Sequence, residues 1–351
     1  MKILHIVFSF RTGGIETMLV NIANEQASLN QQVYIIVIND NVDTTLADSL
    51  SSNVRFICLG KKLGSKNPFY VAKLNFILKK IDPDIVHLHD PGIYKYILLN
   101  YYRRKSCVTA HDVCVFPFCN SLKSIKHIFA ISNVVKKDIM QKIHLDSTVV
   151  LNGIKIDSFK CLKNKPSSLF KMVVISRLLH EKKGQDILIK ALKIVYDKGY
   201  ENFSLDIIGE GPSKSFLEKL VLDNGLDSKI TFLGNKSQDY IFAHLCEYDL
   251  SVQPSRYEGF GLTVVEAMAA KVPVLVSANE GPLEIIDNGK YGFYFKNGDV
   301  EDCAKMIIKI LSNGIDERLV DEAYNRADKF YNVKNTARVY LENYDTIISK
   351  K

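Results

Sequence analysis

The chain has 351 residues, too many for one ordinary compact core and a suitable number for two domains of the usual size. Hydrophobic residues make up 47% of it, as in globular proteins, and no window reaches the ~18 uninterrupted apolar residues of a membrane-spanning helix, which excludes an integral membrane protein. The formal net charge of +7 is uneven, because residues 1–165 carry 22 Lys and Arg against 12 Asp and Glu, and the remainder carries 24 against 27.

The first residues, MKILHIVFSFRTGG, contain one lysine and a short apolar run that resembles a secretory signal peptide. No small-residue cleavage site follows, and a polar glycine turn does, so we interpret the run as a buried first strand. The seven cysteines are odd in number and scattered, which favours reduced thiols in a cytoplasmic protein.

Short β-branched runs alternate with longer amphipathic segments in the first half of the chain, the signature of βαβ units on a parallel sheet. The predicted strands are residues 3–8, 33–38, 54–59, 85–88, 107–110, 127–131 and 148–151. We therefore predict a doubly wound α/β domain over residues 1–160, with ligands at the carboxyl ends of its strands.

Candidate functional residues of this half lie at those carboxyl ends. Gly13 and Gly14 form a strand-to-helix turn whose free amides can contact an anion or a sugar oxygen, although a tight turn alone also accounts for them. His111 follows the strand 107–110. His87 and His89 have a spacing found in metal sites, but a strand places both on one face with no third ligand apparent, so we assign them a structural or acceptor-side role.

The alternation restarts after the polar segment 160–168, which we interpret as a linker. The predicted strands of the second half are residues 172–176, 204–208, 230–233, 250–253, 272–276 and 292–295. Residues 300–350 have a helical period and no strand. These patterns predict a second doubly wound domain over residues 169–330 and a C-terminal helix over residues 331–351 that packs back on the first domain.

The stretch SRYEGFGLTVVE, residues 255–266, places Glu258 in a turn after a strand and Glu266 on the following helix. Gly259 and Gly261 let the backbone approach a ligand closely, and the first helix amides, which lack intrahelical partners, suit an anion such as phosphate. Carboxylates are poor phosphate ligands, so we expect the two glutamates to bind neighbouring hydroxyls. A nucleotide sugar carries hydroxyls on both sides of a pyrophosphate.

Four motifs in this order resemble those of the retaining, two-domain (GT-B) glycosyltransferases of family 4, across nearly the whole chain. They are EGFGLTVVE (258–266), similar to the Glu-x7-Glu motif; ISRLLHEKKGQDILIKAL (175–192), similar to the Arg-x4-Lys segment; IIGEGPSKSFLEKL (207–220), similar to the Gly-x-Gly-Pro turn; and VLNGIKIDSF (150–159), similar to the Asn-Gly linker motif. The resemblance implies an α/β protein of the GT-B fold, with two Rossmann-like doubly wound parallel-sheet domains facing a central cleft. The N-terminal domain would bind the acceptor and the C-terminal domain the nucleotide sugar.

The resemblance also implies roles for single residues. Glu258 would lie by the transferred sugar and Glu266 would bind the nucleotide ribose. Arg177 and Lys182 would neutralise the departing diphosphate. Lys182 keeps the family's spacing from Arg177, but the glycine that usually follows the lysine comes after Lys183, so Lys183 remains an alternative.

The implied catalytic and substrate-binding sets follow from these matches. His111 corresponds to a family histidine that lines the cleft beside the transferred sugar. The implied catalytic residues are His111, Arg177, Lys182 and Glu258. The implied substrate-binding residues are Gly13, Gly14, Gly259, Phe260, Gly261, Leu262 and Glu266.

Two further patterns suggest cofactors, and we reject both. Asp82-Pro83-Asp84 spells the Asp-x-Asp of metal-dependent glycosyltransferases, but a proline before a strand indicates a turn, and cations replace the metal in the resembled family. Gly209-Glu210-Gly211 begins a dinucleotide fingerprint, but Lys214 stands where the third glycine belongs. We expect neither a metal nor a nicotinamide cofactor.

The sequence thus predicts a metal-independent, retaining hexosyltransferase that uses a nucleoside-diphosphate sugar, with a UDP-sugar favoured, in polysaccharide or capsule biosynthesis. No nucleic-acid partner is expected. The basic surplus of the first domain favours a lipid-linked glycan acceptor at the inner, anionic face of a bacterial membrane, although solvated lysines on a soluble enzyme would give the same count. A sugar-nucleotide epimerase of the same fold and a sugar-nucleotide-binding protein without turnover remain alternatives.

Overall fold

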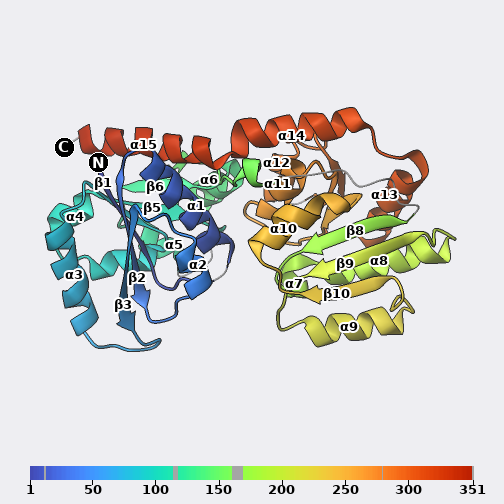
Figure 1. Cartoon of the computed structure of the whole chain (residues 1–351), viewed down its shortest axis with the longest axis horizontal. Coiled ribbons are helices and arrows are strands. Elements are labelled where there is room, and N and C mark those ends of the chain that lie inside the picture. The colour runs from blue at the N-terminus through green and yellow to red at the C-terminus, as the bar shows by residue number, and fades with distance from the viewer. Residues whose placement is uncertain (12, 114–117, 160–168, 279, 350–351) are drawn as a thin grey trace. The chain divides into compact units, whose positions relative to one another are not determined.

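The computed structural model describes residues 1–11, 13–113, 118–159, 169–278 and 280–349. They form two compact units, residues 1–154 with 331–351 (unit 1) and residues 155–330 (unit 2) (Figure 1). The predicted linker, residues 160–168, lies outside the described residues.

Unit 1 contains a seven-stranded parallel sheet in the order β3-β2-β1-β4-β5-β6-β7. The strands are β1 (Lys2–Val7), β2 (Gln32–Asn39), β3 (Val54–Lys61), β4 (Ile85–Leu88), β5 (Ser106–Ala110), β6 (His127–Ala130) and β7 (Thr148–Val149). The central strands are almost continuously buried, because helices cover both faces of such a sheet. The strand order reverses between β1 and β4, and this is where a doubly wound sheet binds its ligands.

The helices of unit 1 lie between these strands in the sequence, except for the last. They are α1 (Gly14–Ser28), α2 (Thr44–Asp48), α3 (Phe69–Ile81), the 3-10 helix η1 (Pro91–Tyr96), α4 (Asn100–Arg104), α5 (Phe118–Leu122), α6 (Asn133–Ile143) and α15 (Val333–Ser349). The last of them, α15, returns from the end of the chain and packs beside α1 (Figure 1). Its Tyr340 and Tyr344 are fully buried in the same core cluster as Ile3 and Phe129, which makes the C-terminus part of the first core.

Unit 2 contains a six-stranded parallel sheet in the order β10-β9-β8-β11-β12-β13, which reverses between β8 and β11. The strands are β8 (Phe170–Ile175), β9 (Phe203–Ile208), β10 (Ile230–Gly234), β11 (Leu250–Gln253), β12 (Val274–Ser277) and β13 (Phe293–Phe295). The helices are α7 (His180–Lys183), α8 (Gln185–Asp197), α9 (Lys214–Asp223), α10 (Gln238–His244), α11 (Leu262–Ala269), α12 (Glu280–Ile285), α13 (Val300–Asn313) and α14 (Glu317–Tyr331). Both predicted doubly wound sheets are confirmed, with every predicted strand in place.

Candidate functional site

The main candidate site of unit 2 lies at the carboxyl ends of β8 and β11, where the strand order reverses. Arg177 follows β8 by two residues, and Glu258 lies in the loop between β11 and α11. Carboxyl ends of adjacent parallel strands meet at one edge of a sheet, so two segments about 80 residues apart in the sequence come together here.

A close backbone contact joins the end of α7 to the loop that carries Glu258. The carbonyl oxygen of Lys182 accepts hydrogen bonds from the amides of Arg256 (2.8 Å) and Tyr257 (3.3 Å). Gly184 ends α7 with a φ of +67°, and a Cβ there would lie 1.9 Å from the carbonyl oxygen of Pro254. Only glycine meets both demands, because it tolerates positive φ and has no side chain to obstruct the contact.

Glu258 is held by polar contacts from two sides. Its carboxylate pairs with the ammonium group of Lys183 and accepts a hydrogen bond from Gln253 Nε2 (3.2 Å). Gln253 also donates to Ser255 Oγ (2.9 Å) and accepts from Thr263 Oγ1 (2.8 Å). The last residue of β11 therefore ties the loop to the first turn of α11. Sequence reasoning missed Gln253, although its place at a carboxyl strand end is the signal that marks such residues.

The Glu258 contact distinguishes Lys183 from Lys182. Consecutive residues of an α-helix project about 100° apart, so the side chains of Lys182 and Lys183 leave α7 in different directions. The Lys183 side chain is 20% exposed and that of Glu258 is 17% exposed, so their ion pair is partly shielded from water. This geometry favours the alternative lysine of the sequence analysis, Lys183, as the cation beside the first glutamate.

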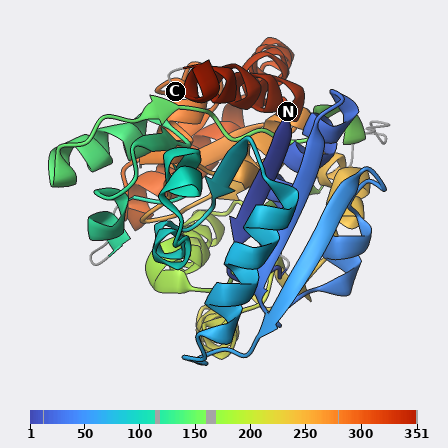
Figure 2. The same cartoon turned by 90° about the vertical axis from the view of Figure 1, so that its left-hand side faces the viewer.

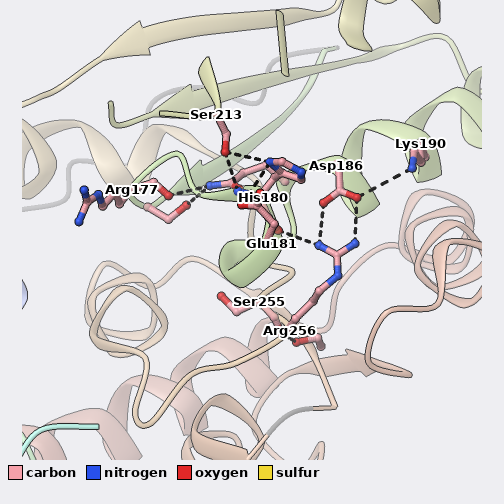
Figure 3. A network of polar contacts seen from close by, with 11 residues as sticks. Arg177, His180, Glu181, Asp186, Lys190, Ser213, Ser255 and Arg256 are labelled. Carbon is pink, nitrogen blue, oxygen red and sulfur yellow. Dashed lines mark hydrogen bonds and ion pairs between the residues drawn. The ribbon is translucent and has the colours of Figure 1, made fainter. Parts of the chain in front are cut away.

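Arg177 has an exposed side chain, and its guanidinium points away from the neighbouring polar network (Figure 3). Its backbone is fixed instead, since its carbonyl oxygen accepts a hydrogen bond from Gln185 Nε2 (2.9 Å). No ion pair joins this guanidinium to any residue in the described parts of the chain. The backbone of Arg177 is thus held in place, while its guanidinium is available for an anionic ligand.

The network beside Arg177 fixes the loop after β11 (Figure 3). Arg256 forms two hydrogen bonds with the carboxylate of Asp186 (2.7 and 2.8 Å) and one with the carbonyl oxygen of His180 (2.7 Å). Burial alone would raise the pKa of Asp186, but the hydrogen bonds and charge of Arg256 outweigh it and lower that pKa. A bidentate pair of this kind sets both distance and orientation, which positions the segment leading to Glu258.

The sequence predicts an anion site at the start of helix α11. Its N-cap is Gly261, with a φ of +113° and no side-chain capping bond. Among the described residues the amides of Leu262 and Thr263 have no hydrogen-bond partner, whereas that of Val264 donates to the carbonyl oxygen of Gly261. Glu266, four residues into this helix, forms no side-chain hydrogen bond or ion pair with the described residues, and desolvation raises its pKa to about 7. Gly259, Phe260 and Leu262 lie in the same turn, with Phe260 buried.

A cluster of four histidines occupies the equivalent edge of unit 1. His89 Nε2 bonds to His5 Nδ1 (3.0 Å), and His89 Nδ1 bonds to His111 Nε2 (3.0 Å). His87 stacks on His89, with ring centroids 4.5 Å apart, and bonds to Tyr344 OH and Thr109 Oγ1. His5 is the one member of this cluster that the sequence analysis did not find, although β1 pairs with β4 so that His5 lies opposite His87.

The hydrogen bonds of this cluster set its tautomers. His5 Nε2 donates to Gln26 Oε1 (2.8 Å), so His5 Nδ1 accepts from His89, and His89 Nδ1 in turn accepts from His111. The Nδ1 atom of His111 then carries a lone pair, and it is buried without a partner among the described residues. His111 can therefore accept a hydrogen bond from a ligand hydroxyl.

These histidines are uncharged near neutral pH. Burial lowers the pKa of His5 and of His111 to about 4, and burial with the neighbouring imidazoles holds the pKa values of His87 and His89 well below their usual range. The ring nitrogens of His5, His87 and His89 lie close enough together to hold a metal ion, but each already takes part in a hydrogen bond.

The remaining candidates of unit 1 have simple local surroundings. Gly13 is the N-cap of α1 in an extended conformation without a side-chain capping bond, and Gly14 begins that helix. Asp82 ends α3 in a left-handed conformation and lies 3.6 Å from Lys105 Nζ, which agrees with the turn predicted there. Asp84 accepts a hydrogen bond from the amide of Lys2 (2.8 Å).

Comparisons with known proteins find similar chains. A staphylococcal capsular polysaccharide biosynthesis glycosyltransferase, CapM of Staphylococcus aureus, is 25% identical over 270 residues, which span 72% of this chain and 65% of CapM. An uncharacterized glycosyltransferase of Methanocaldococcus jannaschii is 27% identical over 243 residues, 66% of each chain. The matched segments thus span just under two thirds of both relatives.

Solved structures match over the full length. The crystal structure of a glycosyltransferase from Rickettsia africae has a TM-score of 0.84 at 24% identity and covers 100% of this chain and 99% of its own. Anabaena HepE, solved in complex with UDP and glucose, has a TM-score of 0.81 at 21% identity and covers 98% of this chain and 99% of its own. These likenesses confirm the predicted GT-B fold.

Two family models match consecutive parts of the chain. The model of Glycosyltransferase Family 4 matches residues 12–158, and that of Glycosyl transferases group 1 matches residues 157–328. Since the two together account for residues 12–328, the chain belongs to the glycosyltransferases that combine these two domains in the GT-B fold.

Proposed function

We propose that this protein is a retaining, metal-independent hexosyltransferase that moves a sugar from a UDP-sugar to a lipid-linked glycan acceptor in polysaccharide biosynthesis. The observation that carries the proposal is the partly shielded pair of Lys183 and Glu258 at the carboxyl ends of β8 and β11. It combines a cation for a diphosphate with a carboxylate for a sugar hydroxyl, beside the available guanidinium of Arg177 and the uncapped start of α11.

The nucleotide sugar would bind unit 2. Arg177, Lys183 and the first amides of α11 would surround the diphosphate, where fixed positive charge stabilises the negative charge that develops as the glycosidic bond breaks. Glu258 would accept a hydrogen bond from a hydroxyl of the transferred sugar, and Glu266 would accept from the ribose. The acceptor would bind unit 1, where His111 offers a lone pair to a further hydroxyl.

The transfer would proceed by attack on the same face that the leaving group departs from. The acceptor hydroxyl oxygen would bond to the anomeric carbon as the bond from that carbon to the β-phosphate oxygen breaks. The hydroxyl proton would pass to that phosphate oxygen, and UDP would leave. The protein would contribute positioning and electrostatics, with no covalent intermediate.

Relatives support the choice of substrates. HepE has been solved with UDP, with UDP and glucose, and with UDP-glucose, which favours a UDP-sugar here. CapM carries the name of a capsular polysaccharide biosynthesis enzyme. No helix among the described residues has the length and hydropathy of a membrane span. The basic surplus of the first half of the chain leads us to propose that a lipid-linked acceptor is reached by peripheral attachment of unit 1 to an anionic membrane.

Thermal unfolding with a panel of nucleotide sugars tests the proposal. A UDP-sugar should raise the midpoint of unfolding by several degrees at saturating concentration, because it binds the folded state alone. The selected sugar nucleotide should then be incubated without an acceptor. Release of UDP together with an epimerised sugar would support the epimerase instead, and binding without turnover on any glycan acceptor would support the non-catalytic alternative.

A chelator should leave the transfer rate unchanged. The reason is that Arg177, Lys183 and the amides of α11 already supply the positive potential that a divalent ion gives in metal-dependent enzymes. The measurement compares initial rates with and without excess EDTA. Loss of activity that Mg²⁺ or Mn²⁺ restores would contradict metal independence and would turn attention to the histidine cluster and to Asp82 and Asp84.

UDP should bind more tightly as the pH rises through about 7, the pKa of Glu266 in the free protein. The ribose hydroxyl groups bind an ionised carboxylate better than a protonated one, so UDP binding lowers the pKa of Glu266. Below pH 7 Glu266 must therefore lose a proton when UDP binds, and this loss lowers the affinity. Isothermal titration from pH 5.5 to 8 measures the effect in the native protein and in Glu266→Gln. The phosphate of UDP titrates in both experiments, but only the native protein has the Glu266 carboxylate. If UDP affinity depended on pH in the same way in the native protein and in the variant, the assignment of Glu266 would be refuted.

A further inference from the structure

A cavity of about 300 Å³ lies in unit 1, at the carboxyl edge of β2 and β3. Its floor is apolar and includes Ile38, Leu59, Val71 and Leu74. Three lysines also line it, from the end of β3, the loop before α3 and the helix η1; they are Lys61, Lys66 and Lys95. The size is at the lower end of the range of small-molecule sites, and the combination of an apolar floor with several cations suits an amphiphilic anion.

Large apolar side chains are also exposed on the same segment of the chain. Leu63, in the loop before α3, is 79% exposed, and Phe69 and Phe76 of α3 are 59% and 68% exposed. The two phenylalanines are seven residues apart and so lie on one face of the helix, the outer one, while Tyr70, Val71 and Leu74 of the other face line the cavity. Figure 2 shows β3 and α3 side by side on the face of unit 1 turned to the viewer.

All charged side chains of the segment that contains β3 and α3 are basic. Between Asp48 and Asp82 the sequence contains no acidic residue. The basic residues in that interval are Arg55, Lys61, Lys62, Lys66, Lys73, Lys79 and Lys80. Lysines alone would be enough to bind a soluble anion. Exposed phenylalanine and leucine side chains next to lysines are instead typical of proteins that bind at the boundary between the headgroups and the acyl chains of an anionic bilayer.

We propose that this surface, formed by the loop before α3, the outer face of α3 and the cavity beside them, docks on an anionic membrane, with one acyl chain of an anionic phospholipid in the cavity. The lipid phosphate would lie against Lys61, Lys66 and Lys95, while Leu63, Phe69 and Phe76 would enter the bilayer boundary. The inference deepens the proposed function and rests on its membrane-bound acceptor, because it names the face that reaches that membrane.

Sedimentation with vesicles tests the surface. The native protein should bind phosphatidylglycerol vesicles at low salt, bind them less at high salt, and bind phosphatidylcholine vesicles weakly. The double variant Lys61→Ser/Lys66→Ser should bind anionic vesicles about 25-fold more weakly, at about fivefold for each lysine. Phe69→Ser/Phe76→Ser, which changes no charge, should also lose binding.

The matched control is Lys137→Ser/Lys142→Ser, which removes the same charge from exposed positions of α6, beside the opposite edge of the sheet. Equal losses in the two lysine pairs would show that net charge alone drives binding and would overturn the proposed surface. UDP-sugar binding, measured by thermal unfolding, should be the same in all of these variants. A loss of vesicle binding with that stabilisation intact therefore separates this inference from the assignment of the nucleotide-sugar site.

Tryptophan fluorescence tests the cavity itself. The chain contains no tryptophan, so Tyr70→Trp places a single reporter in the cavity wall. Phosphatidylglycerol brominated on its acyl chains should quench this tryptophan, whereas glycerol phosphate and inorganic phosphate should leave its emission unchanged. Vesicle binding without quenching would exclude a chain in the cavity, and a response to inorganic phosphate would identify a soluble anion as the occupant.

Discussion

Lys183→Ala is expected to lower kcat by about a hundredfold, the scale of losing one electrostatic group at a site of developing charge. Lys183 pairs with Glu258, so its removal takes away a cation beside the diphosphate and leaves a partly buried carboxylate without its partner. Arg177→Ala should have an effect of similar size, because its guanidinium is directed away from the carboxylates of Glu181 and Asp186 (Figure 3).

The neighbouring Lys182→Ala serves as the matched control, since it deletes the same charge one residue away. We expect a much smaller loss of kcat, because adjacent helical positions project in different directions. Steady-state rates at saturating nucleotide sugar measure all three variants. A larger loss in the Lys182 variant than in the Lys183 variant would reverse our assignment and restore the spacing implied by the family resemblance.

Glu258→Gln is expected to lower kcat by about a hundredfold to a thousandfold while leaving UDP affinity nearly unchanged. The substitution keeps the size of the side chain and removes its charge, so it weakens a hydrogen bond that the transferred sugar makes and UDP does not. Single-turnover rates and isothermal titration with UDP separate the two effects.

For Glu266→Gln we expect the opposite result in the same measurements, a loss of UDP affinity rather than of kcat. Its carboxylate is assigned to the ribose, so the variant should lose UDP affinity and retain more of its turnover at saturation. If Glu258→Gln weakened UDP binding as much as Glu266→Gln does, the two glutamates would not divide between the sugar and the nucleotide as proposed.

The strands of both sheets could be predicted from the sequence, because each strand depends on residues that are neighbours in the chain. The strands of both sheets are short β-branched runs separated by amphipathic segments, and each run lies within a residue or two of the observed strand. Parallel strands that helices cover on both faces must be almost wholly apolar, so each strand is visible in the sequence as a continuous apolar run. The glycine turn before α11, with Glu258 and Glu266 on its two sides, is likewise a contiguous motif, so the sequence alone shows it.

Only the tertiary structure decided which distant residues meet. Spacing along the chain favoured Lys182, but the close contact of Gly184 with Pro254 brings Lys183 to Glu258, and no local pattern encodes a contact between segments about 75 residues apart. His5 joins His87 for the same reason, because strand register, rather than sequence distance, places β1 beside β4. Long-range pairings arise from burial and topology that many residues determine together, so they become visible only when the chain is folded.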